Sequence, residues 1–493
     1  MASAMFFMAA LSAAAQSKDF KLGQWTEIHS SIIKELNRSY VDTLPVDKLF
    51  RAGIDAMLEQ LDPYTVYIPE EENDDLQMML SKTYGGIGAI IHKKKEDNVI
   101  INEPYFGSPA HKNGLRCGDE IIEIDGVPTK GLETKESSDR MKGKPGTKVV
   151  FKVKKVRTGD TLDVAITRER IHFPDIEYSG MLDAETGYIL QSGFTEGVGQ
   201  QVKERVLQLK SQGMKRLVLD LRGNGGGLMS EAVNIISLFV PKGSLAVSSK
   251  GLTDDTKREY KTQSEPIDTE IPIIIMVDGG SASASEIVSG GLQDLGRARI
   301  MGQTSFGKGL VQSIRPLPYN GQMKVTTAKY YTPSGRCVQG VGVTPDVKID
   351  VPSYSRLVYS LVLGGVIDQY VLKFVQTCDS IAAVDDYHFS DEDFENFIDF
   401  AKTQDFDYRS SAKATFDKMK KELEEDGLAE VMSPELNALE KALEMDKERF
   451  IRLKKDEIIP FLEEEIVTRY WFQEAGVKLR LRYDKQLMEA LKK

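Results

Sequence analysis

The spacing of apolar residues changes character several times along the chain. Between residues 25 and 80 they recur every three or four positions, which is the spacing of one face of an α-helix. The residues that carry this pattern are Ile28, Ile32, Ile33, Leu36, Leu49, Ile54, Met57 and Leu61. From residue 84 to 170 short β-type runs such as Val99–Ile101 and Val149–Val153 are separated by glycine turns. The pattern predicts a small helical unit followed by a domain of strands and helices.

Strands and helices then alternate. The pattern predicts strands at 188–190, 217–221 and 273–277, with helices at 199–211 and 230–239 between them. Such alternation is typical of an α/β core with a largely parallel sheet. After about residue 352 the chain becomes helical and rich in charge, and the charges indicate a solvated helical face.

The length of 493 residues is too great for one ordinary core. The changes in pattern predict a multidomain α/β protein with helical N- and C-terminal regions. The predicted segments are 1–16 as a signal peptide, 17–82 as an N-terminal helical region, 83–171 as a strand-rich domain, 172–351 as the α/β core and 352–493 as a C-terminal helical region.

Composition narrows the classes of function. Hydrophobic residues at 41% and charged residues at 28% are ordinary for a soluble globular protein. The net charge of −11 argues against general affinity for nucleic acid. The three cysteines are far apart and the five histidines are scattered, so we expect neither a disulfide framework nor a metal, and no cofactor.

The first fifteen residues suggest export. A short uncharged apolar run, 4–11, is followed by the small residues 12–15 that a signal peptidase requires. No basic residue precedes Lys18, which departs from the usual signal pattern, and a flexible apolar N-terminus is the alternative. We expect an exported, periplasmic protein.

A glycine cluster opens the strand-rich domain. Tyr84, Gly85, Gly86, Ile87 and Gly88 precede a β-type stretch, and Ser-Pro-Ala at 108–110 is followed by further glycine turns. These spacings resemble PDZ domains, which bind peptides by adding a strand to a sheet edge and receive the terminal carboxylate on glycine-rich backbone amides. The resemblance implies a peptide-binding site at residues 84–88; taken alone, the loop would be no more than a strand-entry glycine cluster.

The segment 278–286, Asp-Gly-Gly-Ser-Ala-Ser-Ala-Ser-Glu, joins a predicted strand to a helical pattern. A turn of small residues exposes a hydroxyl beside free helix-terminal amides, which suits a nucleophile. However, Ser283 and Glu286 also have capping-box spacing, and a serine at a helix start is usually only a cap.

The segment 302–312, Gly-Gln-Thr-Ser-Phe-Gly-Lys-Gly-Leu-Val-Gln, decides between these interpretations. It resembles the lysine segment of the carboxy-terminal processing peptidases, serine proteases with a Ser-Lys dyad. Family spacing implies Ser283 as nucleophile, rather than Ser281 or Ser285, and Lys308 as general base. The resemblance further implies that Gln312 positions the lysine and that Asp294 supports the site.

The chemistry agrees with these residue types. A serine hydroxyl needs a base, and no histidine lies in this region. A lysine can serve when neutral, which requires its pKa to fall from about 10.4 by about three units, or about 4 kcal/mol. Burial by Phe306, Leu310 and Val311 would supply this effect if these side chains face the amine.

Residues 217–227 form a predicted strand that ends in a glycine loop. Leu228 stands where a dinucleotide-binding turn needs its third glycine, and no phosphate loop follows. The segment is similar to the second signature of the same peptidases, which implies that the amides of Gly225 or Gly226, with that of Ala284, form the oxyanion hole.

The resemblance covers about residues 55 to 350, including Leu-Asp-Pro-Tyr-Thr at 61–65 and the motifs at 329–336 and 342–346. It implies a serine endopeptidase with a crotonase-like α/β core that cleaves exported proteins near accessible C-termini. A catalytically inactive PDZ adaptor, or acyl-CoA chemistry on a related core, are the rival functions. Assembly into a homo-oligomer and activation by a partner are left open by the sequence.

Overall fold

The computed structural model describes residues 18–492 except 74, 75, 77, 79, 80, 93–96, 407–410 and 444–446. The predicted signal peptide therefore lies outside the described residues. The chain forms two compact units. Of the described residues, the smaller contains those from 18 to 70 together with 312–326, and the larger contains those of 71–311 and 327–492.

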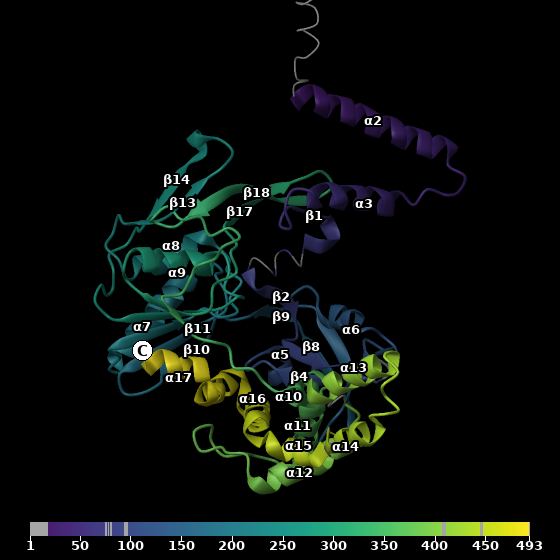
Figure 1. The fold of residues 1–493 in the computed structure, drawn as a ribbon. Helices are drawn as coiled ribbons and strands as arrows, with labels where there is room; N and C mark the ends of the chain where they lie inside the picture. The colour runs from purple at the N-terminus through teal and green to yellow at the C-terminus, as the bar shows by residue number, and fades with distance from the viewer. Residues whose placement is uncertain are drawn as a thin grey trace, which may run out of the picture. The chain divides into compact units, whose positions relative to one another are not determined.

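The smaller unit begins with two helices (Figure 1). They are α2, Lys18–Ser39, and α3, Val46–Glu59, and they agree with the helical pattern of the sequence. Strand β1, Val66–Ile68, pairs antiparallel with the first residues of β18, Gln322–Tyr331. The apolar residues of α2 do not form a buried core. No residue of this helix is buried, and Trp25 is 66% exposed.

A strand-rich domain opens the larger unit. Its sheet has the order β3-β4-β5-β7-β8, and a separate antiparallel pair joins β2 to β9. The bounds are β2 Thr83–Gly86, β3 Ala89–His92, β4 Val99–Pro104, α5 Pro109–Lys112, β5 Glu120–Ile124, β6 Val127–Pro128, α6 Thr134–Met141, β7 Lys148–Lys154, β8 Thr161–Thr167 and β9 Glu169–His172, after the 3₁₀ turn η1 Glu70–Glu72. A compact apolar cluster that includes Ile101, Ile121 and Phe151 fills it.

The α/β core is built on a second sheet, of order β10-β11-β12-β15-β16-β19. All neighbours from β11 to β19 are parallel, and only the edge strand β10 is antiparallel. The bounds are β10 Ile176–Met181, β11 Thr186–Gln191, α7 Val198–Ser211, β12 Arg216–Asp220, α8 Met229–Ser237, β15 Ile273–Val277, α9 Ala284–Asp294, β16 Arg299–Gly302 and β19 Val347–Lys348. This is the parallel α/β core that the alternating pattern predicts.

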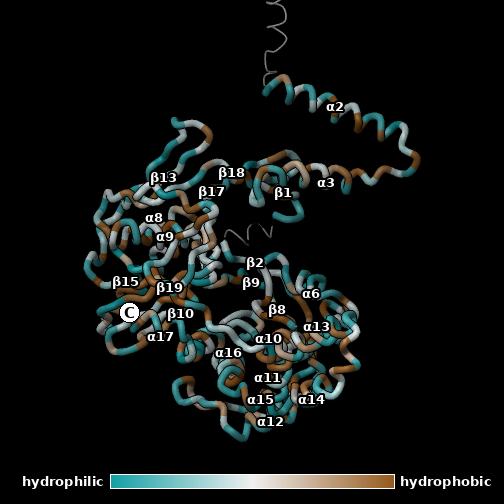
Figure 2. The backbone as a smooth tube through the Cα atoms, in the orientation of Figure 1, coloured by the Kyte–Doolittle hydropathy of each residue, from teal (hydrophilic) through white to brown (hydrophobic). Residues whose placement is uncertain are grey.

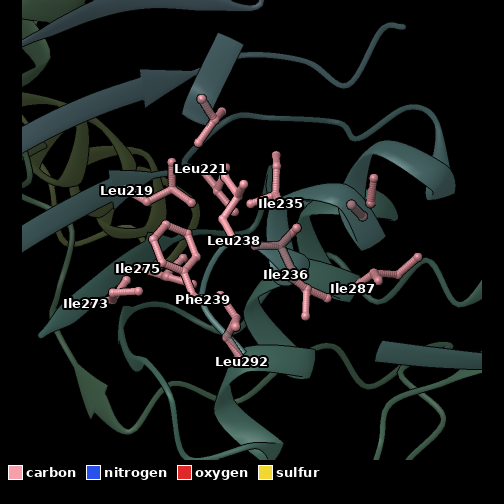
Figure 3. Packing of buried hydrophobic residues seen from close by; sticks show 14 of the residues in the cluster. Leu219, Leu221, Ile235, Ile236, Leu238, Phe239, Ile273, Ile275, Ile287 and Leu292 are labelled. Atoms are coloured by element: carbon pink, nitrogen blue, oxygen red, sulfur yellow. The ribbon is translucent and has the colours of Figure 1, made fainter. Parts of the chain in front are cut away.

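Side chains of this sheet divide between two apolar clusters because successive residues of a strand point to opposite faces. Leu219 and Ile275 point to one face of the sheet, where they join the apolar cluster that contains Phe239 and Ile287. Figure 3 shows this cluster. Val218, Ile274 and Met276 join the opposite cluster, which also contains Val477, Leu487 and Ala490 from the C-terminal region. Both faces of the sheet are therefore covered, as a parallel sheet requires.

A third sheet contains β13, Leu245–Lys250, and β14, Arg258–Lys261, with β18 beside β13. Strand β17, Leu310–Pro316, pairs with β18, and the 3₁₀ turn η2, Asp254–Thr256, precedes β14. The sequence pattern did not predict this sheet, in which the residues of β14, β17 and β18 are largely half-buried or exposed.

The C-terminal region is helical, as predicted. Its helices are α10 Arg356–Leu363, α11 Val366–Thr377, α12 Asp391–Lys402, α13 Ser411–Glu425, α14 Ser433–Leu443, α15 Lys447–Leu453, α16 Lys455–Arg480 and α17 Lys485–Lys492, with the 3₁₀ turn η3 Leu481–Tyr483. They enclose an apolar cluster of their own, and Figure 2 shows the hydrophobic residues distributed along these helices. The predicted multidomain α/β architecture with a helical C-terminal region is thus confirmed, while the crotonase-like assignment stays a prediction.

Within the described ranges, no single helix has both the length and the apolarity to cross a membrane; α10 and α11 pass that test only as a pair, bent by 57°.

Helix α16 also packs against the strand-rich domain. Gln473 Nε2 donates to Glu103 Oε2, and Arg469 Nη2 donates to Asn102 Oδ1 at 2.8 Å. Glu103 is 2% exposed, and its Oε1 has no hydrogen-bond partner among the described residues. Burial raises the pKa of Glu103 to about 7. The hydrogen bond from Gln473 and the positive charge of Arg469 lower this pKa, but burial has the larger effect.

We predict a pH-dependent stability that traces to Glu103. Because its pKa is higher in the folded than in the unfolded chain, its stabilising contribution is complete below about pH 4.5 and is lost as the pH rises through about 7. Glu103→Gln, which cannot ionise, should gain up to about 3 kcal/mol relative to the natural chain between pH 5 and pH 8. Thermal unfolding of both proteins across this range measures the difference.

Glu196→Gln, at an exposed position of the same unit, controls for the general loss of one negative charge. A difference between Glu103→Gln and the natural chain that stays constant from pH 5 to pH 8 would contradict the assignment.

Candidate active site

Three loops meet at one edge of the parallel sheet. They follow β12, β15 and β16, which are neighbours in the sheet, so the carboxyl ends of all three strands lie side by side. The loops contain the candidate oxyanion glycines, Ser283 and Lys308. Ligands of open α/β sheets bind at this edge.

Ser283 occupies a strained turn between β15 and α9. Its backbone has φ 58° and ψ −112°, a region that a residue with a side chain rarely adopts. The side chain is half-buried, whereas Ala282 and Ala284 on either side are buried. Such strain persists only where surrounding contacts impose it, and it is typical of a nucleophile held at a strand-to-helix turn.

The carboxyl group of Glu286 supplies those contacts. Its Oε2 accepts the N–H of Ser283 at 2.9 Å and the N–H of Lys308 at 2.8 Å. Its Oε1 accepts the N–H of Gly307 at 2.7 Å and the hydroxyl of Ser305 at 2.5 Å. Because one oxygen atom is shared, the amide nitrogens of Ser283 and Lys308 lie less than about 6 Å apart. The structure therefore brings the two predicted dyad segments together.

Tyr330 of β18 makes a second connection between the same segments. Its Oη lies 3.0 Å from the carbonyl oxygen of Ser283 and 2.8 Å from that of Lys308. The side chain is 1% exposed, and burial raises the pKa of Tyr330 well above its usual value. The hydroxyl therefore stays a donor at any physiological pH.

The glycine loop after β12 lies against the serine. A Cβ on Gly226 would come within 2.8 Å of both Ser283 Cβ and the amide nitrogen of Ala284, so only glycine fits there. The N–H of Gly226 donates to Asn224 Oδ1 at 2.9 Å. Among the described residues, the N–H groups of Gly225 and Ala284 have no acceptor, so the two candidate glycines are not equivalent.

Asn224 fixes this loop to the serine turn. Its carbonyl oxygen accepts the N–H of Ala282 at 3.0 Å and the hydroxyl of Ser285 at 2.8 Å, while its side chain donates to Gln191 O at 2.8 Å. Ser285 is fully buried and engaged in this contact. Ser281 is likewise buried and donates to Leu221 O at 2.7 Å, which leaves Ser283 as the half-buried serine of the turn.

The apolar residues around Lys308 are arranged differently from the expectation. Phe306 is 56% exposed, and Leu310 and Val311 are half-buried. Phe306 points to solvent because its neighbours Ser305 and Gly307 turn inward to Glu286. Phe306 therefore contributes little to any apolar shield, and burial of the Lys308 amine stays a prediction.

Asp294 lies at the far end of α9 from Ser283, about 15 Å along the helix axis. It accepts the N–H of Ser334 at 2.9 Å and the hydroxyl of Ser334 at 2.6 Å, and it pairs with Arg336. Its direct contacts therefore support the turn after β18 rather than the dyad.

Gln312 lies in the smaller unit, on β17. Its Nε2 donates to Thr326 Oγ1 at 3.3 Å, and the N–H of Thr326 donates to Thr65 Oγ1 at 3.2 Å. Asp62 in turn accepts the N–H groups of Tyr64 and Thr65 at 2.8 and 2.9 Å. Within this unit the predicted motif at 61–65 and Gln312 thus share one hydrogen-bond network; the role of Gln312 toward the lysine stays a prediction.

The candidate peptide-binding residues lie at the start of the strand-rich domain. Tyr84, Gly85 and Gly86 belong to β2, Ile87 is buried in the domain core, and Gly88 has φ 72°. Strand β3 follows directly, and among the described strands it pairs with β4 alone, so its other edge has no strand partner there. Strand addition requires such an unpaired edge, and peptide binding at residues 84–88 stays a prediction.

Family models match three stretches of the chain. Residues 76–154 match the PDZ domain, residues 185–349 match peptidase family S41, and residues 357–493 match a domain described as "Probable PDZ-protease, C-terminal helical domain". The PDZ stretch contains the candidate peptide-binding residues, and the S41 stretch contains Ser283 and Lys308.

Two relatives each match about two thirds of the chain. The carboxy-terminal-processing protease of Bartonella bacilliformis is 37% identical over 327 residues, which cover 65% of this chain and 74% of the relative. A probable CtpA-like serine protease of Staphylococcus aureus is 35% identical over 328 residues, which cover 66% of this chain and 65% of the relative. A solved structure titled photosystem II D1 C-terminal processing protease has 27% identity and a TM-score of 0.41, and the match covers 69% of this chain and 91% of that one.

The family matches and the relatives identify a serine-type peptidase with a PDZ domain in the same chain. The chain belongs to peptidase family S41, the family of the carboxy-terminal-processing proteases. The resemblance seen in the sequence is confirmed at this level.

Sequence reasoning missed the residues that hold the site together. It assigned Glu286 a capping role only, and it left Tyr330, Ser305 and Asn224 without any role. The separation of 22 residues between Glu286 and Lys308 gave no local signal, because β16 must first return the chain to the sheet edge.

Among the described residues, no group of three His, Cys, Asp or Glu side chains could hold a metal ion.

We predict that Tyr330→Phe lowers kcat about tenfold or more, because the serine and lysine segments lose a shared donor and a shift of 1 Å is costly in a catalytic site. The ring remains in the core, so the loss of folding free energy should be only about 1 to 3 kcal/mol. Peptide cleavage and thermal unfolding measure the two effects.

Tyr260→Phe removes one hydroxyl from a half-buried tyrosine of β14 in the same unit and should leave kcat unchanged. Equal kcat values for the two variants would show that Tyr330 does not position the site.

Proposed function

We propose that the chain is an exported serine endopeptidase that cleaves proteins near their C-termini with a dyad of Ser283 and Lys308. The observation that carries this proposal is the shared acceptor: one oxygen of Glu286 receives the N–H groups of both residues. This contact supports the proposal because it holds the backbone of the proposed nucleophile close to that of the proposed base, although 25 positions separate them in the sequence. The crotonase-like nature of the core is part of the same proposal.

The reaction begins with proton transfer. The neutral amine of Lys308 takes the proton of Ser283 Oγ while Oγ attacks the carbonyl carbon of the scissile peptide bond. The tetrahedral intermediate carries its negative charge on the former carbonyl oxygen. When it collapses, the C–N bond breaks and the leaving amine takes the proton from Lys308. An ester between Ser283 and the new C-terminus remains.

Hydrolysis of the ester repeats these steps with water. Lys308 takes a proton from water, the hydroxide attacks the ester carbonyl, and Ser283 recovers its proton as the acid leaves. In both halves the N–H groups of Gly225 and Ala284 stabilise the oxyanion. A pair of fixed amides can contribute roughly 3 kcal/mol each to the transition state.

The PDZ domain supplies substrate capture in this proposal. The edge of β3 adds the substrate tail as a strand, and the backbone at residues 84–88 receives its terminal carboxylate. Substrates with flexible, accessible C-termini satisfy both requirements. The apolar run at 4–11 supports export to the periplasm, where such substrates would be proteins of the cell envelope.

We predict that a fluorophosphonate probe labels Ser283 and no other serine of the turn. The activated oxygen displaces fluoride from phosphorus, whereas the hydroxyls of Ser281 and Ser285 are buried and donate to backbone carbonyls. Mass spectrometry of the labelled protein identifies the site. Ser283→Ala should lose both labelling and cleavage of an unfolded substrate protein while its thermal unfolding is retained.

Lys308→Met tests the base separately, because it keeps an unbranched chain and removes the amine. Labelling of Ser283 should slow at least a hundredfold, and the rise of the natural enzyme's activity with pH should disappear. Cleavage by Ser283→Ala at the natural rate would refute the proposed mechanism.

A further inference from the structure

The glycine loop beside Ser283, residues 223–227, has no side-chain packing among its glycines that would fix its conformation. Gly223, Gly226 and Gly227 have φ of 68°, 93° and 154°, values open to glycine and unfavourable for other residues. A chain of glycines gains nothing from side-chain packing and loses more conformational freedom on folding than any other. The positions of its amides must therefore be set by contacts of the residues around them.

Contacts from the serine turn fix one side of the loop. The N–H of Gly223 donates to Asp278 Oδ1 at 2.8 Å, and Asn224 O accepts from Ala282 and Ser285. These contacts lie on the side of the loop that faces the nucleophile.

The other side is fixed through Arg222, the residue before Gly223. Its guanidinium group binds Asp220 through Nε and Nη2, at 3.0 and 2.5 Å, and it binds Asp484 through Nη2 and Nη1. Nη1 also donates to Gln486 Oε1 at 3.0 Å. In the described part of the chain, Nη1 has hydrogen-bond partners in the C-terminal segment alone.

The C-terminal segment is firmly held in this place. Asp484 Oδ1 accepts the N–H of Leu487 at 2.9 Å and so caps the start of α17. Leu487 and Ala490 are buried against the face of the sheet that contains Val218 and Met276. At the far end of α17, Arg216 Nη1 donates to Leu491 O at 3.4 Å.

Asp484 and Arg222 are both shielded from water, with side chains 14% and 17% exposed. Burial lowers the pKa of Arg222, but the carboxylates of Asp220 and Asp484 outweigh burial and raise it above its usual value. Burial raises the pKa of Asp484, and the hydrogen bond and charge of Arg222 bring it below its usual value. A charged group left alone here would be costly.

We infer that Asp484 and Gln486 are positioning residues of the peptidase: through Arg222 they hold the glycine loop whose amide stabilises the oxyanion. The last helix of the chain is then a working part of the active site, although it lies about 260 residues from the loop in sequence. The expected effect on catalysis rests on the proposed function. The expected effect on the position of the glycine loop rests on the contacts of Arg222 alone.

Asp484→Asn tests the link with little other change. The asparagine oxygen can still cap α17, since Asn is as good a capping residue as Asp, while its NH₂ group faces the guanidinium as a donor against a donor. We expect kcat for peptide cleavage to fall about tenfold with KM changed less than twofold. We also expect faster hydrogen exchange at the amides of 223–226, and partial recovery of both in Asp484→Glu.

Arg216→Gln is the matched control. It loosens α17 at its other end, about 13 Å away along β12, and should destabilise the helix without changing kcat or exchange in the loop. If Asp484→Asn fails to fold, Gln486→Met removes one contact of Nη1 at nearly constant volume and is expected to shift exchange in the same direction.

Exchange and kcat that remain at natural values in Asp484→Asn and Gln486→Met would overturn the inference. The same holds if Arg216→Gln lowers kcat as much as Asp484→Asn. Faster exchange in the loop of a protein whose natural form cleaves no peptide would support the structural link and reject the proposed function, so the two failures are distinguishable.

Discussion

The site depends on a single buried carboxyl group. Glu286 receives four hydrogen bonds, two on each oxygen, from residues of the serine turn and the lysine loop. Without this group the buried N–H groups of Gly307 and Lys308 and the hydroxyl of Ser305 would lose an acceptor in a place that water reaches poorly, at about 1 to 3 kcal/mol each. The same carboxyl group holds Ser283 at a positive φ and holds the backbone of Lys308 next to the serine turn.

The parallel sheet explains why these segments can meet at all. Strands β12, β15 and β16 are adjacent, and the loops that follow them emerge at the same edge. The sheet itself requires cover on both faces. Helices α7, α8 and α9 belong to the core on one side, and residues of α16 and α17 complete the other. The C-terminal helical region is thus part of the fold of the core, and through Arg222 it reaches the glycine loop beside Ser283.

Local patterns in the sequence were enough to predict the main strands and helices of the α/β core. Strand β15 begins and ends at the predicted residues, 273 and 277, and the predicted helices at 199–211 and 230–239 correspond to α7 and α8. The family resemblance selected Ser283 and Lys308, and the structure brings their backbone N–H groups to one acceptor, while their catalytic roles stay a prediction. These features succeed because periodicity and turn chemistry act over a few residues.

Contacts between distant segments were beyond such reasoning. The spacing of Ser283 and Glu286 indicates only a cap, and nothing in it shows that the same carboxyl group binds Lys308. Asp294 looked like a support of the dyad, yet the length of α9 carries it to the opposite end. The direction in which Phe306 faces could not be read from the sequence; it is 56% exposed, while Ser305 and Gly307 on either side of it bind Glu286.

The most direct test compares two buried glutamates. Glu286→Ala removes the shared acceptor, whereas Glu231→Ala removes a carboxyl group of similar burial from the first turn of α8, where it accepts the N–H of Gly199 at 2.8 Å. With both variants folded by circular dichroism, Glu286→Ala should slow fluorophosphonate labelling of Ser283 at least a hundredfold, and Glu231→Ala should change it less than threefold. Equal labelling rates in the two variants would contradict the account.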